Sequence, residues 1–460
     1  MAWNVLILGG GFGGLTAARR LERKLPHQSA TVTLVNDANF MLYTPLLPGA
    51  AGGTLEPRHV VVPLREQLDR TVLHLGTVTG ADPERKVVSV RSIGGRDQEL
   101  PYDQLIVTLG STSRTLPIPG LAEHAVGFKT LPEAIALRNR LLQYFEQAEI
   151  EPDPAVQREL LTFVFVGGGY AGLEGLAELQ DLAADVIEEY PRCRVAGMRF
   201  MLVEARERVM MEIQPKLAEF ASAELRRRGI EIRTQTTVEE ITATSVSLST
   251  GEVLPCRTVV WTAGVKPHPV VAKLGLPLAA GGRIEADRYC AVAGRPGVWA
   301  IGDAAAIPDP AAKGNPSPPT AQHVLRQAKV AADNVVHALQ GKAGPGRPFR
   351  YRTLGVFVDM GRHQAVASTL GIRWRGFPAW FLARTYHLAL MPGLGRRVRL
   401  VTDWTVGLVF GRDSAELGRL GHPPGLMEHT AGEGEEPDGA AGSADAAPAP
   451  APARTSTRAG

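Results

Sequence analysis

The 460-residue sequence predicts an α/β protein with two Rossmann-like domains, the first interrupted by the second, and a C-terminal membrane-associating region. Three observations predict this arrangement. Two glycine-rich turns, at residues 9–14 and 167–172, each follow a short apolar run and precede a stretch rich in Ala and Leu. A later strand-like segment that ends in Gly-Asp, residues 297–303, returns the chain to the first domain. Aromatic residues flanked by arginines then fill much of the region after residue 346.

The two turns, GGGFGG and GGGYAG, both fit the pattern G-x-G-x-x-G. The first glycine permits a tight turn from strand to helix, the second lets a pyrophosphate approach the backbone, and the third lets the helix pack closely on the strand. The N-terminus of the helix then faces the phosphates. One such turn can be a flexible loop, but two in the same context predict two dinucleotide sites.

The composition is that of a globular protein and excludes several functional classes. The chain is 44% hydrophobic and carries a net charge of +3, a balance too mild for a nucleic-acid-binding surface. The three cysteines, Cys193, Cys256 and Cys290, form no C-x-x-C pair, which argues against a redox disulfide and a cysteine zinc site, and we expect no metal. We expect neither a signal peptide nor a spanning helix of ~20 apolar residues, and therefore a cytoplasmic-side location.

The first domain begins with a predicted strand at 4–8, a helix at 15–24 and a second strand at 31–35. A dinucleotide-binding fold places a carboxylate at the end of the second strand, where it binds a ribose hydroxyl. Asn36 stands at that end and Asp37 follows one place later. Either residue is a candidate for the ribose, and either could equally be an ordinary turn residue.

The rest of the first part, which we place at residues 1–120, is mostly predicted β structure. The apolar segment 40–47 is expected to form a wall over a flat cofactor ring rather than a strand of its own. Further strands are predicted at 72–78, 86–90 and 104–110, and a helix at 133–149 follows, within the bounds of the second domain.

The second domain, placed at 121–280, has a helix from residue 172 to about residue 190 that carries Glu174. The strand at 199–204 ends in Glu204, a ribose candidate that favours a free 2′-hydroxyl over a 2′-phosphate. Arg206 and Arg208 weaken that preference, because their charges attract a phosphate. A helix at 218–228 and three β-like stretches complete the domain, which ends in a strand at 258–264.

The chain returns to the first domain over residues 281–345. A Pro-rich loop at 308–319 follows the Gly-Asp strand, and a helix runs from 320 to about 339. A linker at 341–348 leads out of the domain.

The C-terminal region, 346–420, combines β-like residues at 351–368 with two apolar runs, 377–390 and 404–410. Aromatic bodies with basic flanks favour an interfacial membrane anchor, although a dimer interface or packing against the core would use the same surface chemistry. The tail at 421–460 is rich in Gly, Ala, Pro and acids and is predicted to be disordered. The basic residues in and around the two runs are Arg373, Arg375, Arg384, His387, Arg396, Arg397, Arg399 and Arg412.

These segments together resemble the type II NADH dehydrogenases, which are single-subunit, FAD-containing NADH:quinone oxidoreductases that do not pump protons and belong to the pyridine nucleotide-disulfide oxidoreductases. The resemblance covers about residues 3–420. It is carried by GGGFGG, FKTLPEAIALRNR (128–140), VGGGYAGLE, WTAGVK (261–266), AIGD (300–303) and PTAQ (319–322).

The resemblance implies which residues hold which cofactor. Glu174 and Gln322 are implied as catalytic residues, with Glu174 orienting the nicotinamide and relaying a proton, and Gln322 and Arg326 are implied at the quinone. The NADH residues are implied to be Gly167, Gly169, Gly172, Glu204, Ala263 and Gly264. The FAD residues are implied to be Gly9, Gly11, Phe12, Gly13, Gly14, Asn36, Asp37, Val78, Thr108, Gly110, Gly302, Asp303, Ala321 and Gln322.

Two positions depart from the family pattern. The family usually has an acid where Asn36 stands, and a glutamine where Arg326 stands. The expected partners are NADH, a membrane quinone, the inner face of the cytoplasmic membrane and a second copy of the chain. A soluble NAD(P)H:acceptor flavoreductase, or a flavoprotein redox sensor or scaffold, is the alternative interpretation.

Overall fold

The computed structural model describes residues 2–312, 314–353 and 355–418, and every structural statement below concerns those residues. Met1–Glu416 forms one compact unit. The tail at 421–460, which was predicted to be disordered, lies outside the described residues.

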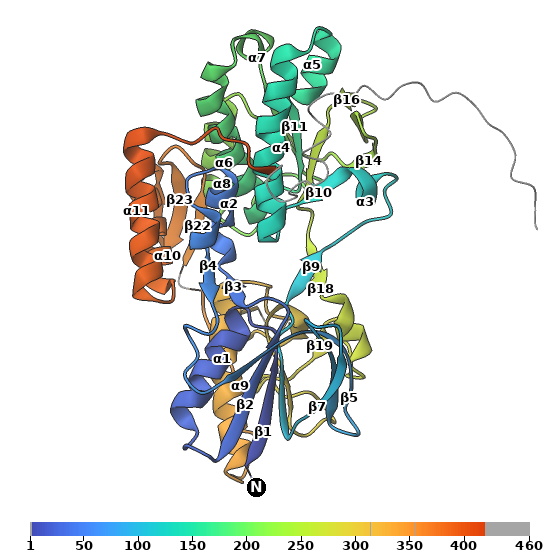
Figure 1. Cartoon of the computed structure of the whole chain (residues 1–460), viewed down its shortest axis with the longest axis vertical. Coiled ribbons are helices and arrows are strands. Elements are labelled where there is room, and N and C mark those ends of the chain that lie inside the picture. The colour runs from blue at the N-terminus through green and yellow to red at the C-terminus, as the bar shows by residue number, and fades with distance from the viewer. Residues whose placement is uncertain (1, 313, 354, 419–460) are drawn as a thin grey trace, which may run out of the picture. The chain divides into compact units, whose positions relative to one another are not determined.

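The first domain is built on a seven-stranded sheet with the order β20-β8-β1-β2-β5-β6-β7. Strand β1 is parallel to both of its neighbours, and its four residues Val5 to Leu8 are buried, as expected for a parallel strand covered on both faces. Helices α1 (Phe12–Lys24) and α9 (Ala321–Leu339) pack side by side in this domain (Figure 1). The strands are β1 (Trp3–Leu8), β2 (Ala30–Asn36), β5 (Val72–Asp82), β6 (Val87–Ser92), β7 (Asp97–Pro101), β8 (Gln104–Val107) and β20 (Val298–Ala300).

The second domain has a five-stranded, wholly parallel sheet with the order β10-β17-β11-β12-β13. Helix α6 (Tyr170–Val186) follows β11 and is buried along most of its length. The strands are β10 (Ala125–Gly127), β11 (Thr162–Val166), β12 (Arg199–Val203), β13 (Glu231–Arg233) and β17 (Thr258–Trp261). The other helices are α3 (Leu121–His124), α4 (Leu131–Ile150), α5 (Pro154–Leu160), α7 (Pro191–Ala196) and α8 (Pro215–Arg227).

The C-terminal region consists of an antiparallel sheet and two helices. Its strands are β22 (Gly355–Asp359), β23 (Ala365–Thr369) and β24 (Ile372–Arg375), and its helices are α10 (Gly376–Leu390) and α11 (Leu394–Phe410). Met391 and Leu400 are fully buried in the core of the first domain, so the region packs on the rest of the unit. Among the described helices, none combines the length and the apolar character needed to cross a bilayer.

Short elements complete the chain. The strands are β3 (Phe40–Leu42), β4 (Val61–Pro63), β9 (Ser111–Ser113), β14 (Val238–Ile241), β15 (Ser245–Leu248), β16 (Val253–Pro255), β18 (Val265–Pro267), β19 (Ile284–Glu285) and β21 (Ala305–Ala306). The helical elements are η1 (Thr44–Leu46), α2 (Leu47–Ala51), η2 (Pro57–His59), η3 (Ile187–Glu189), η4 (Pro269–Lys273), η5 (Gly302–Ala304) and η6 (Pro310–Ala312).

The α/β architecture with two Rossmann-like sheets is confirmed, and one local prediction was wrong. The segment 40–47 does begin with a strand, β3, because β4 offers it a paired edge. The helix of the second domain ends at Val186 and continues as the 3-10 turn η3, short of residue 190. The second apolar run of the C-terminal region is the last part of the longer helix α11.

Candidate functional site

The first glycine-rich turn has the backbone geometry that its sequence predicts. Gly9 has a φ of 98°, and a side chain at Gly9 would lie 2.4 Å from the carbonyl oxygen of Thr108. A Cβ at Gly14 would lie 1.9 Å from the carbonyl oxygen of Gly9, so only glycine lets α1 come this close to β1. Gly11, by contrast, faces open space with no atom within 4 Å of an added Cβ. The turn is therefore closed on its protein side and open at the position reserved for a pyrophosphate.

The second turn repeats this geometry. Gly167 has a φ of 109°, and a Cβ at Gly172 would lie 2.0 Å from the carbonyl oxygen of Gly167. Gly169 faces open space, as Gly11 does in the first turn. Ala263 and Gly264 follow β17, whose end lies beside this turn because Thr262 Oγ1 donates to the carbonyl of Gly167 at 3.0 Å. The structure thus contains two cradles of the same shape.

The strand-end residues Asn36 and Glu204 occupy equivalent positions. Asn36 Oδ1 accepts a hydrogen bond from the amide of Gly10 at 2.7 Å, and Glu204 Oε2 accepts one from the amide of Gly168 at 2.6 Å. Asp37 is exposed and makes no such bond. An amide oxygen in the first domain therefore makes the contact that a carboxylate makes in the second.

A chain of polar side chains joins the start of β9 to the Gly-Asp turn after β20. Ser111 Oγ donates to Asp303 Oδ2 at 2.5 Å, and Lys129 Nζ donates to Ser111 Oγ at 2.7 Å. Burial lowers the pKa of Lys129, while the nearby carboxylates of Asp303 and Glu133 oppose that shift. Ser111 and Lys129 were not among the residues predicted to bind a cofactor.

Three other predicted FAD residues lie in the same part of the first domain. Gly13 packs against Thr108, since an added Cβ would meet Thr108 Oγ1 at 2.2 Å. The amide of Gly302 donates to Gln327 Oε1 at 2.9 Å, which ties the Gly-Asp turn to α9. The side chain of Val78 is buried in the hydrophobic core, so only its backbone is available to a ligand.

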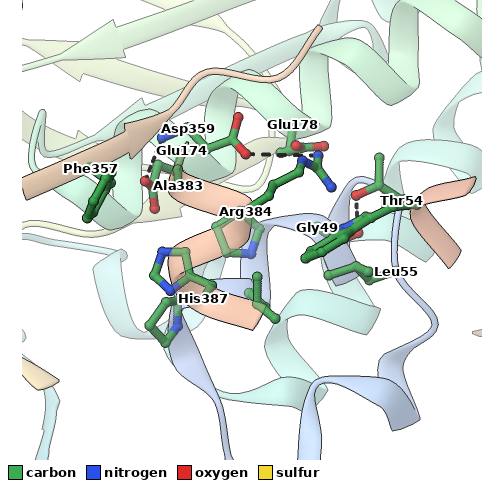
Figure 2. Close-up of a pocket in the computed structure, with 14 residues that line it drawn as sticks. Gly49, Thr54, Leu55, Glu174, Glu178, Phe357, Asp359, Ala383, Arg384 and His387 are labelled. Carbon is green, nitrogen blue, oxygen red and sulfur yellow. Dashed lines mark hydrogen bonds and ion pairs between the residues drawn. The ribbon is translucent and has the colours of Figure 1, made fainter. Parts of the chain in front are cut away.

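A cavity of about 480 Å³ opens beside Glu174, one turn into α6 (Figure 2). Its walls come from residues 45–55 of the first domain, from α6 and β22, and from the inner faces of α10 and α11. Glu174 Oε1 accepts a hydrogen bond from the amide of Asp359 at 2.9 Å. Burial raises the pKa of Glu174 well above its ordinary value, so this carboxyl keeps its proton to a higher pH than an exposed glutamate.

Two residues of α10, Arg384 and His387, project into this cavity (Figure 2). The Arg384 guanidinium lies 4.4 Å from the ring centre of Trp380 and 4.8 Å from that of Trp404, and one nitrogen lies 3.9 Å from Asp359 Oδ2. Burial, aided by the charge of Arg384, lowers the pKa of His387 to about 4, so its imidazole is neutral at pH 7.

Two of the residues that line the cavity have a buried donor without an acceptor. Arg384 Nε and Trp404 Nε1 are both buried, and within the described part of the chain neither has a hydrogen-bond partner. A buried unpaired donor costs about 1–3 kcal/mol, which a ligand with a carbonyl oxygen would recover. Arg384 and His387 stand at i and i+3 in an otherwise apolar run, a spacing that places both on one face of α10. This spacing was the feature of the sequence that could have predicted their place in the cavity.

Gln322 and Arg326 of α9 do not line this cavity. Gln322 Nε2 donates to the carbonyl of Gly355 at 3.0 Å, and its Oε1 accepts from the hydroxyl of Tyr351. Arg326 lies 4.0 Å from the ring centre of Tyr351 and donates to the carbonyl of Gln322. Their predicted role at the quinone stays a prediction, whereas Glu174, Arg384 and His387 share one cavity.

Arg412 does not belong to the basic surface that was predicted around the apolar runs. Its side chain is 9% exposed, and it forms ion pairs with Glu178 at 3.2 Å and with Asp185 at 3.3 Å. It also donates to the carbonyl of Gly52 at 3.0 Å. The segment after α11 is therefore fastened to α6, because the acids of α6 require a buried cation.

Replacing this cation is expected to destabilise the protein strongly. Arg412→Ala leaves the buried carboxylate of Glu178 without its ion-pair partner, and we expect the free energy of unfolding to fall by about 3–5 kcal/mol. Urea unfolding at pH 7 measures this change. Arg373→Ala, at an exposed position of β24, is the control and is expected to change stability by less than about 0.5 kcal/mol. Equal losses in the two variants would contradict the assignment.

Comparison with known proteins agrees with this geometry. Residues 3–334 match the family described as pyridine nucleotide-disulphide oxidoreductase. The type II NADH:quinone oxidoreductase Ndh of Mycobacterium tuberculosis is 32% identical over 88% of this chain and 87% of its own. The demethylphylloquinone reductase NdbB of Synechocystis is 31% identical over 87% of this chain and 97% of its own.

A solved structure shows the same fold. The structure of NDH2 from Plasmodium falciparum in complex with NADH superposes with a TM-score of 0.83, at 18% identity, over 90% of this chain and 100% of that one. With the family match over residues 3–334 and the relatives above 30% identity, the sequence resemblance is confirmed. The chain belongs to the pyridine nucleotide-disulphide oxidoreductase family and, within it, to the type II NADH dehydrogenases.

Proposed function

We propose that this chain oxidises NADH and reduces a quinone, with FAD at the first glycine-rich turn, NADH at the second and the quinone in the cavity beside Glu174. One observation carries the proposal. Helix α6 begins at the second cradle, and one turn later its Glu174 borders a cavity that the first domain and α10 enclose. The names of the M. tuberculosis and Synechocystis relatives support NADH and a quinone as the substrates.

The first turn and its neighbours fit FAD. The open space at Gly11 suits a pyrophosphate, and Asp303 offers a carboxylate beside the end of β8. In this proposal residues 1–120 and 281–345 form the FAD-binding domain, and residues 121–280 form the NADH-binding domain. When bound, FAD accepts a hydride from NADH and passes two electrons to the quinone.

In this proposal the residues around the cavity supply a proton and hold the quinone. NADH delivers a hydride, so each quinone that becomes a quinol needs one additional proton. Burial raises the pKa of Glu174, so its carboxyl keeps a proton to a higher pH than an exposed glutamate, which suits a proton donor. Arg384 Nε and Trp404 Nε1 are the donors that would bind a quinone carbonyl and hold it for this transfer.

Anaerobic stopped-flow absorbance of the purified protein tests the proposal. Addition of NADH is expected to bleach the flavin band, and a short-chain quinone is expected to restore it. Bleaching without recovery would assign the electrons to another acceptor, or to a redox sensor. No bleaching by NADH would overturn the proposal.

Preference for NADH over NADPH is expected to depend on Glu204. Arg208 donates to the carbonyls of Met210 and Ile213 and is not free for a phosphate, which leaves Arg206 as the competing cation. Glu204→Ala is expected to raise KM for NADH about tenfold and to narrow the gap to NADPH, because the repulsion of a 2′-phosphate disappears. Steady-state kinetics with both nucleotides measure the ratio. Glu207→Ala, an exposed acid in the same loop, is the control, and an unchanged ratio in Glu204→Ala would reject the role.

We infer that the outer faces of α10 and α11 attach the protein peripherally to the inner face of the cytoplasmic membrane, where NADH and a membrane quinone are both available. Phe377 and Phe381 of α10 are 57% and 61% exposed. Leu394, Val398 and Leu408 of α11 are 76%, 57% and 60% exposed and recur at helical spacing. An exposed apolar face of this kind marks a membrane or protein contact, and the same face could pair two copies of the chain.

Acidic substitutions on this face are expected to abolish membrane attachment. Phe381→Asp with Val398→Asp places two charges where the face meets hydrocarbon, so cosedimentation with phosphatidylcholine vesicles should be lost. Val195→Asp, at an 88% exposed position of α7, is the control and should leave binding unchanged. Unchanged binding of the double variant would contradict the assignment, and loss of a dimer in light scattering without loss of vesicle binding would assign the face to a second copy.

A further inference from the structure

A second cavity, separate from the one beside Glu174, lies between η2 and the first turns of α11. It is open to solvent and is lined by Arg58, His59, Val61, Arg396 and Arg399. Three of its five lining residues carry a guanidinium group. No residue is shared with the lining of the cavity beside Glu174.

Contacts within the chain neutralise these charges only in part. His59 Nδ1 lies 2.7 Å from Asp403 Oδ2, so this acid is already occupied by the imidazole. Arg396 donates to the carbonyl of Arg58 at 2.8 Å, and Glu66 lies at the 4.0 Å limit of an ion pair with Arg396. These contacts fix the position of the Arg396 guanidinium without pairing it closely to a carboxylate.

The charges of the other two arginines, Arg58 and Arg399, are little neutralised by acids of the chain. Arg58 pairs with Glu56 at 2.9 Å, but its side chain is 85% exposed, and exposed pairs of this kind contribute little. Arg399 makes no hydrogen bond or ion pair with any residue that the structure describes. The cavity therefore has a positive charge that the folded chain leaves unused.

The position of these arginines along α11 does not stabilise the helix. Arg396, Arg397 and Arg399 lie in its first two turns, where the helix macrodipole is positive, and the first turn contains no acid. Arg397 has a local role, because it donates to the carbonyls of Ala389 and Met391 at the end of α10. Arg399 has no comparable role, so its charge is better explained by an anion from outside the chain.

The cavity lies at the flank of the exposed apolar face. Leu394, Val398 and Val401 recur at i, i+4 and i+7 on the outer side of α11, whereas Leu400 is fully buried on the opposite side. At about 100° per residue, Arg399 falls between these two sides. A lipid layer in contact with the outer face would therefore bring its phosphates level with Arg399.

We propose that this cavity binds the phosphate of an anionic phospholipid headgroup. The proposal rests on the membrane association proposed above and specifies which lipid the attached protein selects. The cavity is lined by guanidinium groups that match phosphate oxygens in charge and geometry, and it adjoins a surface suited to acyl chains.

Vesicle binding by the full chain tests the proposal. Cosedimentation is compared between phosphatidylcholine vesicles and vesicles that also contain phosphatidylglycerol. Wild type is expected to bind the anionic vesicles more tightly. Arg58→Gln with Arg399→Gln should lose about fivefold in affinity per arginine on anionic vesicles, and nothing on phosphatidylcholine alone.

A matched variant separates a site from diffuse attraction. Arg373→Gln with Arg375→Gln removes the same charge from β24, outside the cavity, and is expected to lose far less. Equal losses in the two double variants would overturn the proposal. Equal binding of wild type to both kinds of vesicle would also overturn it while leaving membrane association intact, whereas no binding to either would overturn membrane association itself.

A soluble probe distinguishes the lipid from a free anion. Monomeric dihexanoyl phosphatidylglycerol is expected to raise the melting temperature of wild type and not that of Arg399→Gln. The side chain of Arg399 makes no hydrogen bond or ion pair with the described residues, so this variant should fold normally, as circular dichroism would verify. An equal stabilisation by inorganic phosphate at the same concentration would show a general anion site and overturn the assignment to a lipid.

Discussion

Glu174→Gln is expected to slow the reoxidation of reduced flavin by quinone by about 100-fold or more, while bleaching by NADH slows much less. The amide keeps the size of the side chain and can still accept the hydrogen bond from the amide of Asp359, but it has no proton to give. Loss of a positioned proton donor typically costs 10²–10⁴-fold in rate. Anaerobic stopped-flow absorbance separates the two half-reactions.

The pH profile distinguishes a proton donor from a structural residue. The raised pKa of Glu174 means that the carboxyl keeps its proton to a higher pH than an exposed glutamate and loses it as the pH rises through that pKa. Wild type should therefore keep a constant rate of quinone reduction at lower pH and lose rate above it, and Glu174→Gln should show no such decline. Glu174→Asp should restore part of the decline.

A neighbouring acid provides the control. Glu178 lies one turn further along α6 and borders the same cavity, but its carboxylate is paired with Arg412. Glu178→Gln is expected to keep the alkaline decline. If the decline survives in Glu174→Gln or disappears in Glu178→Gln, Glu174 is not the donor.

The glycine-rich cradles were predictable because much of what they require is local. An added Cβ at Gly14 would meet the carbonyl of Gly9 within the same turn, and the positive φ of Gly9 belongs to the turn itself, whereas the contact of Gly9 with Thr108 comes from a distant segment. The departure at Asn36 has a structural reason that the pattern alone could not supply. Its amide oxygen makes the same bond to the turn as the carboxylate of Glu204, and the fold tolerates either residue.

The cavity was only half predictable, because its walls come from distant parts of the chain. Glu174 was implied by the family resemblance, but Asp359, which bonds to it, and Arg384, which pairs with Asp359, come from elements roughly 200 residues later in the chain. The apolar run of α10 was interpreted as a membrane surface. In the structure its inner face carries Arg384 and His387 into the cavity, while Phe377 and Phe381 remain exposed. The same apolar run therefore lines the cavity with one face and is exposed on the other, and only tertiary packing distinguishes the two faces.

Arg412 shows that a buried ion pair between distant residues is equally hard to predict from the sequence. In the sequence it is one of several arginines near an apolar run, and nothing local marks it as buried. Its partners Glu178 and Asp185 lie on α6, more than 200 residues earlier. Glu178 was visible as a helical residue, but its need for a cation follows only from its burial in the folded chain.

Gly11→Val is expected to give a folded protein that contains almost no flavin. Gly11 has a φ of −71°, which valine adopts readily, and an added Cβ meets no atom within 4 Å. The substitution therefore leaves the chain undisturbed and fills only the space reserved for the pyrophosphate. Flavin absorbance per chain should fall to about one tenth or less of wild type, with an unchanged far-ultraviolet circular dichroism spectrum.

Gly169→Val is the matched variant in the second cradle, and it distinguishes the two sites. Gly169 has a φ of −80° and the same open surroundings, so this chain should also fold normally. It is expected to retain its flavin while KM for NADH rises about tenfold or more. Loss of flavin from Gly169→Val, with retention in Gly11→Val, would reverse the assignment of the two cofactors. If both variants keep flavin and an unchanged KM, neither open glycine faces a pyrophosphate, and the two cradles would have to be reassigned together.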